Sequence, residues 1–351
     1  MIKLIRPIDG QEISLQTEIQ KQFLADEPYR AQMDGALTFQ WYDLERQGED
    51  HSAPAPVVFS WQESEAENGG AAYYLLVSEC ADMCHARHYV TEQTAHAVYN
   101  LKVNTTYYWC VQRGGKRSEI ACFRTADTLP RCIKIDHISN VRDLGGYRVK
   151  GGRIRQGLVY RGGEFELHMQ LDAQGARELL RLGVKTELDM RGEARGQVEF
   201  TTAQAIGIKR VFVPSVPYAA VFEPEQAQQL HEFFKVFTDP ASYPVYFHCW
   251  GGADRAATFA YLLGAALGMC EQDLITEYEF TSLSIWGVRS RNYEGFQAFL
   301  RMLMQLPGND MREKAHTFLR QYAALTQAQI ARMEDILLIK EETASADGGF
   351  E

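Results

Sequence analysis

The stretch from Tyr243 to Leu267 constrains the fold of this chain more than any other part of the sequence. Residues 245–247 are apolar, β-branched or aromatic, which predicts a short buried strand, and Pro244 suits the start of that strand. Residues 256–267 favour helix and are apolar on nearly every side, which predicts a buried helix. A buried strand, a tight loop and a buried helix in succession indicate an α/β fold for this part of the chain.

The loop between this strand and this helix has the composition of an anion site. Backbone N–H groups in a tight loop at a helix N-terminus bind anions, and Gly251 and Gly252 permit positive φ and close approach of the backbone to a ligand. Arg255 can hold two oxygens of a phosphoryl group bidentately. Cys249 then lies in line to attack phosphorus, and we expect it to attack as a thiolate.

Length and charge narrow the remaining possibilities. A chain of 351 residues exceeds the usual size of one domain, so two domains are expected. The net charge of −10 argues against a general nucleic-acid binder. Neither an N-terminal secretion signal nor an apolar run of about 18 residues is visible in the sequence, so we expect no membrane span.

The seven cysteines are odd in number and irregular in spacing, which indicates a reducing compartment, the cytoplasm, rather than a disulfide framework. Cys80, Cys84, His85 and His88 stand close together in the sequence, but their spacing fits no zinc pattern. In a strand-and-loop region we expect these side chains not to converge. The sequence therefore predicts no metal site and no cofactor.

Residues 1–125 are predicted to form an all-β sandwich domain. Short aromatic and β-branched runs alternate there with polar and glycine-containing segments, whereas residues 17–32 have a more helical pattern. The predicted strands are residues 57–61, 72–77, 97–101, 106–111 and 120–123, with a first strand within 2–15.

A polar segment with a proline at 125–131 is the predicted linker to a second domain over 126–340, where strand and helix patterns alternate. Helices are expected there over residues 171–182, 226–236, 273–280, 296–306, 314–322 and 328–338. The last stretch, 341–351, is rich in Glu, Ala, Ser and Gly and is predicted to be a disordered tail.

The arrangement His248-Cys249, five residues and Arg255 resembles the signature of cysteine-dependent protein tyrosine phosphatases. With Gly252, and with Asp254 directly before the arginine, it is similar to the bacterial branch of that family, which acts on phosphotyrosine, sometimes phosphoserine or phosphothreonine, and phosphoinositides. The resemblance implies a catalytic α/β domain with a central, largely parallel sheet flanked by helices.

Further segments carry the same resemblance over roughly residues 132–340. Residues 140–146 are similar to the family's N-F-R-D-L-G-G segment, with Val141 in place of the aromatic residue, and 160–163 and 189–191 are similar to two other family segments. In the first domain, Phe59-Ser60-Trp61 and residues 101–109 resemble a fibronectin type III module over 54–125.

The resemblance implies a phosphomonoesterase that forms a cysteinyl-phosphate. The catalytic residues it implies are Cys249 as nucleophile, Arg255 as phosphate clamp and Asp254 as general acid and base. The phosphate-binding residues would be Trp250, Gly251, Gly252 and Ala253, and the supporting ones Asp143, Arg161, Asp189, Arg191 and His248. Asp143 could either brace the phosphate loop or form a merely structural ion pair. Glu223 and Asp239 are the alternative acids.

Two departures from the family pattern leave alternatives open. Ala253 replaces a common lysine, which favours phosphotyrosine or a small ester over inositol phosphates or phosphoinositides. Ala256 replaces a Ser or Thr whose hydroxyl stabilises the departing thiolate, unless Thr258 substitutes for it. A catalytically weak phospho-binding protein is therefore a further alternative. The expected partner is a phosphorylated protein or a small phosphate ester, and the partner of the β domain stays open.

Overall fold

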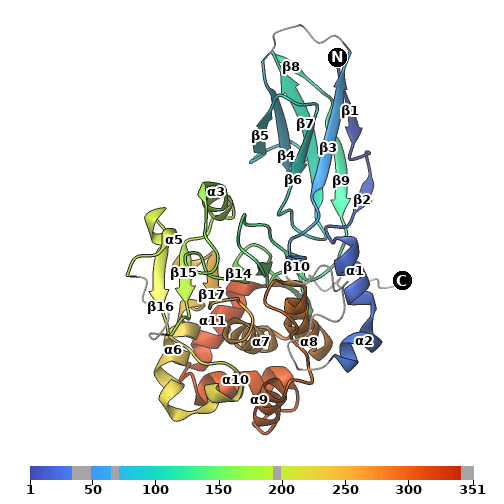
Figure 1. Ribbon diagram of the computed structural model, residues 1–351. Coiled ribbons are helices and arrows are strands. Elements are labelled where there is room, and N and C mark those ends of the chain that lie inside the picture. Colours follow the sequence, from blue (N-terminus) through green and yellow to red (C-terminus); the bar gives the residue numbers. More distant parts are fainter. Residues whose placement is uncertain (34–48, 65–70, 193–198, 341–351) are drawn as a thin grey trace, which may run out of the picture. The chain divides into compact units, whose positions relative to one another are not determined.

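The structure is a computed structural model that describes residues 1–33, 49–64, 71–192 and 199–340 (Figure 1). The chain divides into two compact units. The first contains residues 1–18 and 54–134, and the second contains residues 19–53 and 135–351. Among the described residues, no helix combines the length and the apolar character that crossing a bilayer requires.

The first unit is a β-sandwich, as predicted. One sheet has the strand order β1 (Ile2–Arg6), β3 (Val57–Glu63), β6 (Ala95–Val98). The other has the order β2 (Gln11–Ile13), β9 (Ala121–Thr125), β7 (Thr106–Arg113), β4 (Tyr73–Ser78), β5 (Arg87–Thr91), with β8 (Lys116–Arg117) paired to β7. The Phe59 ring meets those of Trp109 and Phe123 edge-on between the sheets, at 5.1 and 5.6 Å between centroids.

Strand β3 shows why these segments form strands. Its side chains alternate between the core and the solvent: Val57, Phe59 and Trp61 are buried, and Val58 is exposed. Strand β5 was not predicted from the sequence, since its residues are mostly exposed and polar. The loop between β4 and β5 also differs from expectation. It brings Cys80 and Cys84 together with Asp82, so the prediction that these cysteines stay apart is wrong.

The second unit contains the predicted largely parallel sheet. Its strands in this unit run in the order β11 (Arg142–Asp143), β14 (Val159–Gly162), β17 (Val245–His248), β15 (Thr186–Asp189), β16 (Lys209–Phe212). All pairings are parallel except that of β11 with β14. The central strand β17 is buried along its whole length, which accounts for its continuous apolar and aromatic run.

From residue 135 onward, the α-helices of this unit match the predicted periodic segments to within a few residues, except for a short helix over residues 202–205 that was not predicted. They are α3 (Ala173–Arg181), α5 (Thr202–Ala205), α6 (Ala227–Val236), α7 (Arg255–Leu267), α8 (Glu271–Glu279), α9 (Glu294–Met304), α10 (Met311–Gln321) and α11 (Gln327–Leu337). Helix α7 packs against β14, β17 and α10, and every one of its residues except Arg255 is buried. A small sheet of β12 (Arg148–Val149), β13 (Gly152–Ile154) and β18 (Leu338–Lys340) lies outside the main one.

The boundary between the units differs from the predicted one at residue 125. Helices α1 (Glu18–Ala25) and α2 (Glu27–Gln32) group with the second unit from Ile19 onward, whereas residues 126–134 group with the first. Helix α1 packs its Phe23 ring against Phe280 at 6.3 Å, and the buried Arg30 of α2 reaches Glu279 at 3.5 Å. Apolar spacing identifies a helix but not the core against which it packs. The predicted tail 341–351 lies outside the described residues.

Candidate active site

The predicted strand, loop and helix are present at the carboxyl end of the central strand. Strand β17 ends at His248, and α7 begins at Arg255. The register places Gly162 of β14 and Asp189 of β15 beside His248, so three strands end at the same level. Cys249 follows at once and is only 3% exposed. Ligands of parallel α/β sheets bind at this end of the strands.

Four successive carbonyl groups of the loop, those of residues 249–252, are each held by a group outside it. These contacts are His248 Nδ1 to Cys249 (3.0 Å), Glu164 N to Trp250 (2.9 Å), Asn140 Nδ2 to Gly251 (2.9 Å) and Arg161 Nη2 to Gly252. In a trans peptide plane the C=O of one residue and the N–H of the next point in opposite directions. The N–H groups of residues 250–253 therefore point away from these partners, and successive N–H groups free of such partners can bind an anion.

The two glycines of the loop are required for different reasons. Gly252 has φ +67°, and a Cβ there would lie 2.4 Å from the carbonyl oxygen of Gly162. This confirms the predicted positive φ. Gly251 has no positive φ. A Cβ on Gly251 would instead lie 2.5 Å from the ring of Trp286, so this glycine lets the indole cover the loop.

Arg255 is the first residue of α7 and lines a cleft. Its Nη1 donates to the carbonyl of Met190 at 3.0 Å, just beyond the end of β15. With Asp254 it lines a cleft of about 470 Å³, whose other walls are Pro217, Tyr218, Val288, Arg289, Ser290 and Tyr293. The cleft thus combines a guanidinium pair and a carboxylate with two tyrosine rings, which pack edge-on at 5.3 Å.

The carboxylate of Asp254 is held by two neighbours from other parts of the chain. Arg289 donates to it through Nε at 2.8 Å and Nη2 at 2.9 Å, and the Tyr218 hydroxyl donates to the same carboxylate. Burial would raise the pKa of Asp254, but the charge and hydrogen bonds of Arg289 outweigh it and lower the pKa below its usual value. In the free protein this carboxyl is therefore ionised at neutral pH.

The alternative acids are less well placed. Asp239 is exposed, accepts from the Ala241 N–H at 2.9 Å, and precedes β17, at the opposite end of that strand from the loop. Glu223 is exposed directly after the short helix η2 (Tyr218–Phe222) and does not line the cleft. Of the three candidates, only Asp254 adjoins both Arg255 and the cleft.

No hydroxyl takes the place of the missing Ser or Thr after the arginine, as far as the described residues show. Ala256 is fully buried. The buried Thr258 already uses its hydroxyl, which donates to the Asp254 carbonyl at 2.9 Å and accepts from Tyr218 N at 2.9 Å. Helix α7 starts at Arg255 and not later, so Thr258 lies about one helical turn beyond Arg255. Its hydroxyl links the Asp254 carbonyl to the backbone of Tyr218.

His248 belongs to a buried polar layer beneath the loop. Its ring lies between the Cys249 carbonyl at Nδ1 (3.0 Å) and a Glu187 oxygen at Nε2 (2.9 Å), so both ring nitrogens face acceptors. Burial would lower the pKa of His248, but the carboxylates of Asp189 and Glu187 raise it to about 9. The ring is therefore an imidazolium that donates on both sides and fixes the first peptide of the loop.

The predicted pair of Asp189 and Arg191 lies in the same layer. Arg191 donates to Asp189 through Nε (2.9 Å) and Nη2 (2.8 Å), while its Nη1 contacts Glu164 (3.0 Å) and Glu166 (2.7 Å). The ligand atoms of Glu187, Asp189 and His248 lie within 4.8 Å of one another, close enough for a metal ion. These groups are already committed to each other and to arginines, so the donor set fits a structural network rather than a metal.

Arg161 contacts the loop directly, whereas Asp143 holds a turn elsewhere in the same unit. Arg161 is fully buried and bridges the Gly252 carbonyl to Glu277, which also accepts from Arg142 at 2.9 Å. Asp143 accepts from the N–H groups of Gly145 (2.7 Å) and Gly157 (2.6 Å), which fixes a turn. Neither side chain is placed to touch a substrate.

Several residues that support the site were not predicted from the sequence. Asn140 and Glu164 hold loop carbonyls, and the Glu164 carboxylate also accepts from the N–H groups of residues 166–169. This bracing positions His168, whose ring meets Trp250 at 4.9 Å. Asn140 begins the segment 140–146, and Glu164 directly follows 160–163, so both lay beside recognised segments. Arg289, 34 residues after Arg255 in the chain, carries no local signal.

The fold and the site together define a class of protein: an α/β domain with a cysteine-to-arginine loop between a buried central strand and a buried helix. The chain belongs to the tyrosine phosphatase family, whose family model matches residues 133–339. It is 30% identical over 170 residues to a protein of Cupriavidus necator that is provisionally named a tyrosine-protein phosphatase. That match covers 42% of this chain and 61% of the relative.

Two solved structures are similar at low identity. One is the core catalytic domain of the PP-IP phosphatase Siw14 from S. cerevisiae, at 17% identity and a TM-score of 0.31, over 51% of this chain and 88% of that one. The other is a human fibronectin type III domain, at 23% identity and a TM-score of 0.19, over 25% of this chain and 76% of that one.

Proposed function

We propose that this protein is a phosphomonoesterase that hydrolyses aryl phosphate esters, phosphotyrosine in proteins first among them. The single observation that carries the proposal is the orientation of the loop peptides. The carbonyls of residues 249–252 are held by outside groups, so the N–H groups of residues 250–253 face the opposite way, next to Cys249 and at the N-terminus of α7. N–H groups in this arrangement suit the oxygens of a phosphoryl group.

The reaction proceeds in two steps in this proposal. The Cys249 thiolate attacks phosphorus and the ester P–O bond breaks, while Arg255 holds two of the non-bridging oxygens and Asp254 gives a proton to the leaving oxygen. Water then attacks the cysteinyl-phosphate, its proton passes to Asp254, and the S–P bond breaks to regenerate the thiolate. A bound phosphate dianion attracts Arg289 and repels the Asp254 carboxylate, and both effects raise the pKa of Asp254. Asp254 then takes up the proton that it donates in the first step.

The cleft supports an aromatic leaving group. Tyr218, Tyr293, Pro217 and Val288 provide flat and apolar surface beside Arg255, and a phenyl ring packs favourably against such side chains. Ala253 adds no positive charge in the loop, whereas a multiply phosphorylated inositol would benefit from one. Phosphotyrosine therefore stands ahead of inositol phosphates and phosphoinositides as the substrate class.

A second candidate function is a phospho-binding protein that turns over slowly. It is favoured by the buried Ala256 and by the engaged hydroxyl of Thr258. Without a hydroxyl donor, the thiolate is a poorer leaving group in the second step, so the cysteinyl-phosphate would accumulate.

We also infer a cytoplasmic location, which the seven unpaired cysteines support. The partner in this proposal is a phosphorylated protein or a small phosphate ester. The partner of the β-sandwich stays open.

The test is hydrolysis of para-nitrophenyl phosphate in EDTA by the wild type, by Cys249→Ser and by Cys270→Ser. We expect turnover that survives EDTA, is inhibited by vanadate and disappears in Cys249→Ser. Cys270 is exposed on the same unit, so its replacement by serine is the matched control and should leave the rate unchanged. Full activity in Cys249→Ser would overturn the proposal. A panel of phosphotyrosine peptides and inositol phosphates then decides the substrate class by kcat/KM.

A further inference from the structure

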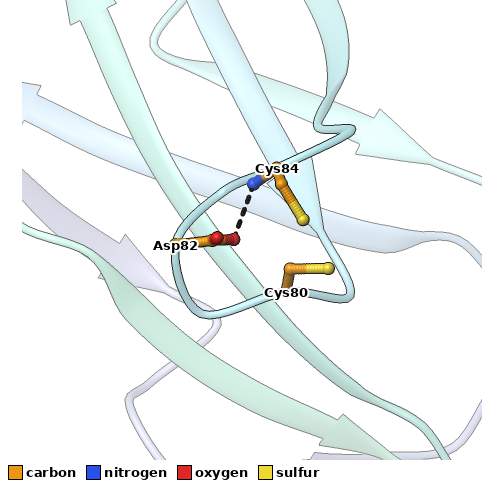
Figure 2. Close-up of side chains that lie close together, drawn as sticks. All are labelled: Cys80, Asp82 and Cys84. Carbon is orange, nitrogen blue, oxygen red and sulfur yellow. Dashed lines mark hydrogen bonds between the residues drawn. The ribbon is translucent and has the colours of Figure 1, made fainter.

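The loop between β4 and β5 gathers three side chains that can bind a metal ion, away from the phosphatase site in sequence and in its own structural unit. The Sγ atoms of Cys80 and Cys84 and a carboxylate oxygen of Asp82 all lie within 4.8 Å of one another. Figure 2 shows these three side chains around a single turn of the chain. Nothing in the proposed phosphatase reaction uses them.

Hydrogen bonds hold this loop in shape without any ion. The Ser78 hydroxyl accepts from Cys80 N at 3.0 Å and donates to the Cys84 carbonyl at 2.6 Å, which closes the loop at its base. Asp82 accepts from Cys84 N at 2.9 Å, which orients its carboxylate (Figure 2). Because the loop is already ordered, binding an ion would cost little conformational entropy.

A small hydrophobic cluster, separate from the main core of the β-sandwich, anchors the same loop. Met83, between Asp82 and Cys84, is buried and packs with Leu76 and Cys110. Its φ of +63° is unusual for a residue with a side chain. The Met83 side chain lies in this cluster, while its two neighbours remain accessible: Asp82 is exposed and Cys84 is half-buried.

We propose that Cys80, Asp82 and Cys84 form a binding site for a thiophilic divalent cation of the zinc type. A tetrahedral zinc ion with sulfur ligands at about 2.3 Å and an oxygen ligand at about 2.1 Å separates those atoms by roughly 3.6–3.8 Å. The three atoms are within 4.8 Å of one another, so movements of about 1 Å complete the site. Two sulfur ligands select zinc-like ions over magnesium or calcium. The fourth position is left to water or another ligand.

The test uses the full chain, reduced and freed of metal, with Co²⁺ as the spectroscopic probe. We expect one equivalent of Co²⁺ to produce a thiolate-to-cobalt absorption band, and Zn²⁺ to displace it. Cys80→Ser and Cys84→Ser should each abolish the band, and Asp82→Asn should weaken binding by roughly 10-fold or more. Cys122→Ser, which removes another half-buried thiol of the same unit, is the matched control and should keep the band.

Two results would overturn the proposal: no thiolate-to-cobalt band in the reduced wild type, or a band that persists in the double variant Cys80→Ser/Cys84→Ser. Circular dichroism of each variant shows whether it is folded. Should a serine variant fail to fold, thermal unfolding of the wild type and of Asp82→Asn, each with and without Zn²⁺, gives a second measure. Zn²⁺ must raise the Tm of the wild type more than that of the variant.

Discussion

Asp254 shows how far neighbouring groups govern the protonation of one side chain. Arg289 contacts its carboxylate at 2.8 and 2.9 Å and keeps its pKa low. If Asp254 is the general acid, the rate falls as pH rises through its pKa, because only the protonated form donates. In Arg289→Gln we expect the alkaline limb of kcat/KM against pH to move upward by roughly 1 to 3 pH units, since an opposing charge is lost.

The control for this experiment is Arg312→Gln. Arg312 also pairs with a carboxylate, Glu334 at 2.6 Å, but lies near Gly268 at the far end of α7. Its replacement should leave the pH profile unmoved, and Asp254→Asn should remove the limb. An unmoved limb in Arg289→Gln, or an intact one in Asp254→Asn, would assign the acid to another group.

Ala256 sets the rate of the second chemical step, by our proposal. Ala256→Ser adds a hydroxyl next to Arg255, where it can donate to the departing thiolate. A hydrogen bond to a charged group contributes about 1.5–3 kcal/mol, so we expect steady-state kcat to rise about 10- to 100-fold. The measurement is rapid-mixing kinetics with para-nitrophenyl phosphate: the wild type should show a burst followed by slow turnover, and the variant a faster steady state.

Ala257→Ser is the matched control for that change. Ala257 is as deeply buried, at 1% exposure, and the substitution adds the same atom one position further along the helix. Equal rates in the two serine variants, or a wild type without a burst, would rule out thiolate departure as the slow step.

His248 makes stability depend on pH in a defined direction. Burial would lower its pKa, but the carboxylates of Asp189 and Glu187 raise it to about 9, above the ordinary value of about 6.5. A raised folded pKa gives stabilisation that is complete below pH of about 6.5 and is lost as pH rises through about 9. We expect this to lower the free energy of unfolding by up to roughly 3 kcal/mol across that window.

Urea unfolding of the wild type and of His248→Asn at a series of pH values measures this contribution. The variant cannot carry the charge, so the gap between the two free energies of unfolding should narrow as pH rises from about 6.5 to 9. A constant gap across the window would mean that the folded protein holds His248 neutral.

At the scale of elements, the loop between β17 and α7 distinguishes two kinds of glycine. In Gly252→Ala the new Cβ meets the backbone oxygen of Gly162 at 2.4 Å and the φ of +67° is strained. A strained residue of this kind costs about 1–3 kcal/mol, and we expect activity and Tm to fall together. In Gly251→Ala the obstacle is the side chain of Trp286, at 2.5 Å, which a second substitution can remove.

The experiment is therefore a pair of double variants. Trp286→Leu should restore much of the activity and Tm lost in Gly251→Ala, and should restore none in Gly252→Ala, because backbone atoms do not move aside. Equal rescue of both variants would show that the loop glycines are interchangeable.

The same elements show what a sequence can and cannot reveal. The strand at 245–248, the glycine loop and the helix from Arg255 could be predicted, because their signals are local in the chain and the family signature marks them. Asn140, Glu164 and Arg289 contact the loop or its aspartate from 35 to more than 100 positions away, and such contacts leave no periodic trace. Strand β5 was missed because its residues are polar and exposed.

At the scale of the whole molecule, the phosphatase unit is built from two separate segments of the chain, residues 19–53 and 135–351. Residues 19–53 belong to the phosphatase unit although 81 residues of the β-sandwich, 54–134, separate them from its remainder. Besides the contacts of Phe23 and Arg30, the Ser52 hydroxyl accepts from the backbone N–H of Asn140 at 2.8 Å, and Asn140 in turn holds the Gly251 carbonyl. The early segment thus braces the site through a short series of contacts.

The predicted domain boundary at residue 125 and the observed division of the chain predict different stabilities and activities for shortened chains. A chain of residues 126–351 loses Arg30, which leaves the fully buried Glu279 with Arg291 alone, at 2.6 Å. It also loses Met33, whose carbonyl accepts from Ser290 at 2.7 Å next to Arg289. Removing one partner of a buried ion pair costs roughly 3–5 kcal/mol, so we expect a lower Tm. We expect weak turnover as well, because Arg289 is no longer held toward Asp254.

The matched comparison keeps residues 19–53 and joins them to 135–351 through a short glycine–serine linker in place of 54–134. This chain lacks the β-sandwich but retains Phe23, Arg30 and Ser52, and it should keep the Tm of the phosphatase unit and kcat/KM for para-nitrophenyl phosphate. Calorimetry and steady-state kinetics on both chains decide the matter. If the chain of residues 126–351 equals the linked chain in both measures, the early helices are dispensable and the phosphatase unit is continuous in sequence after all.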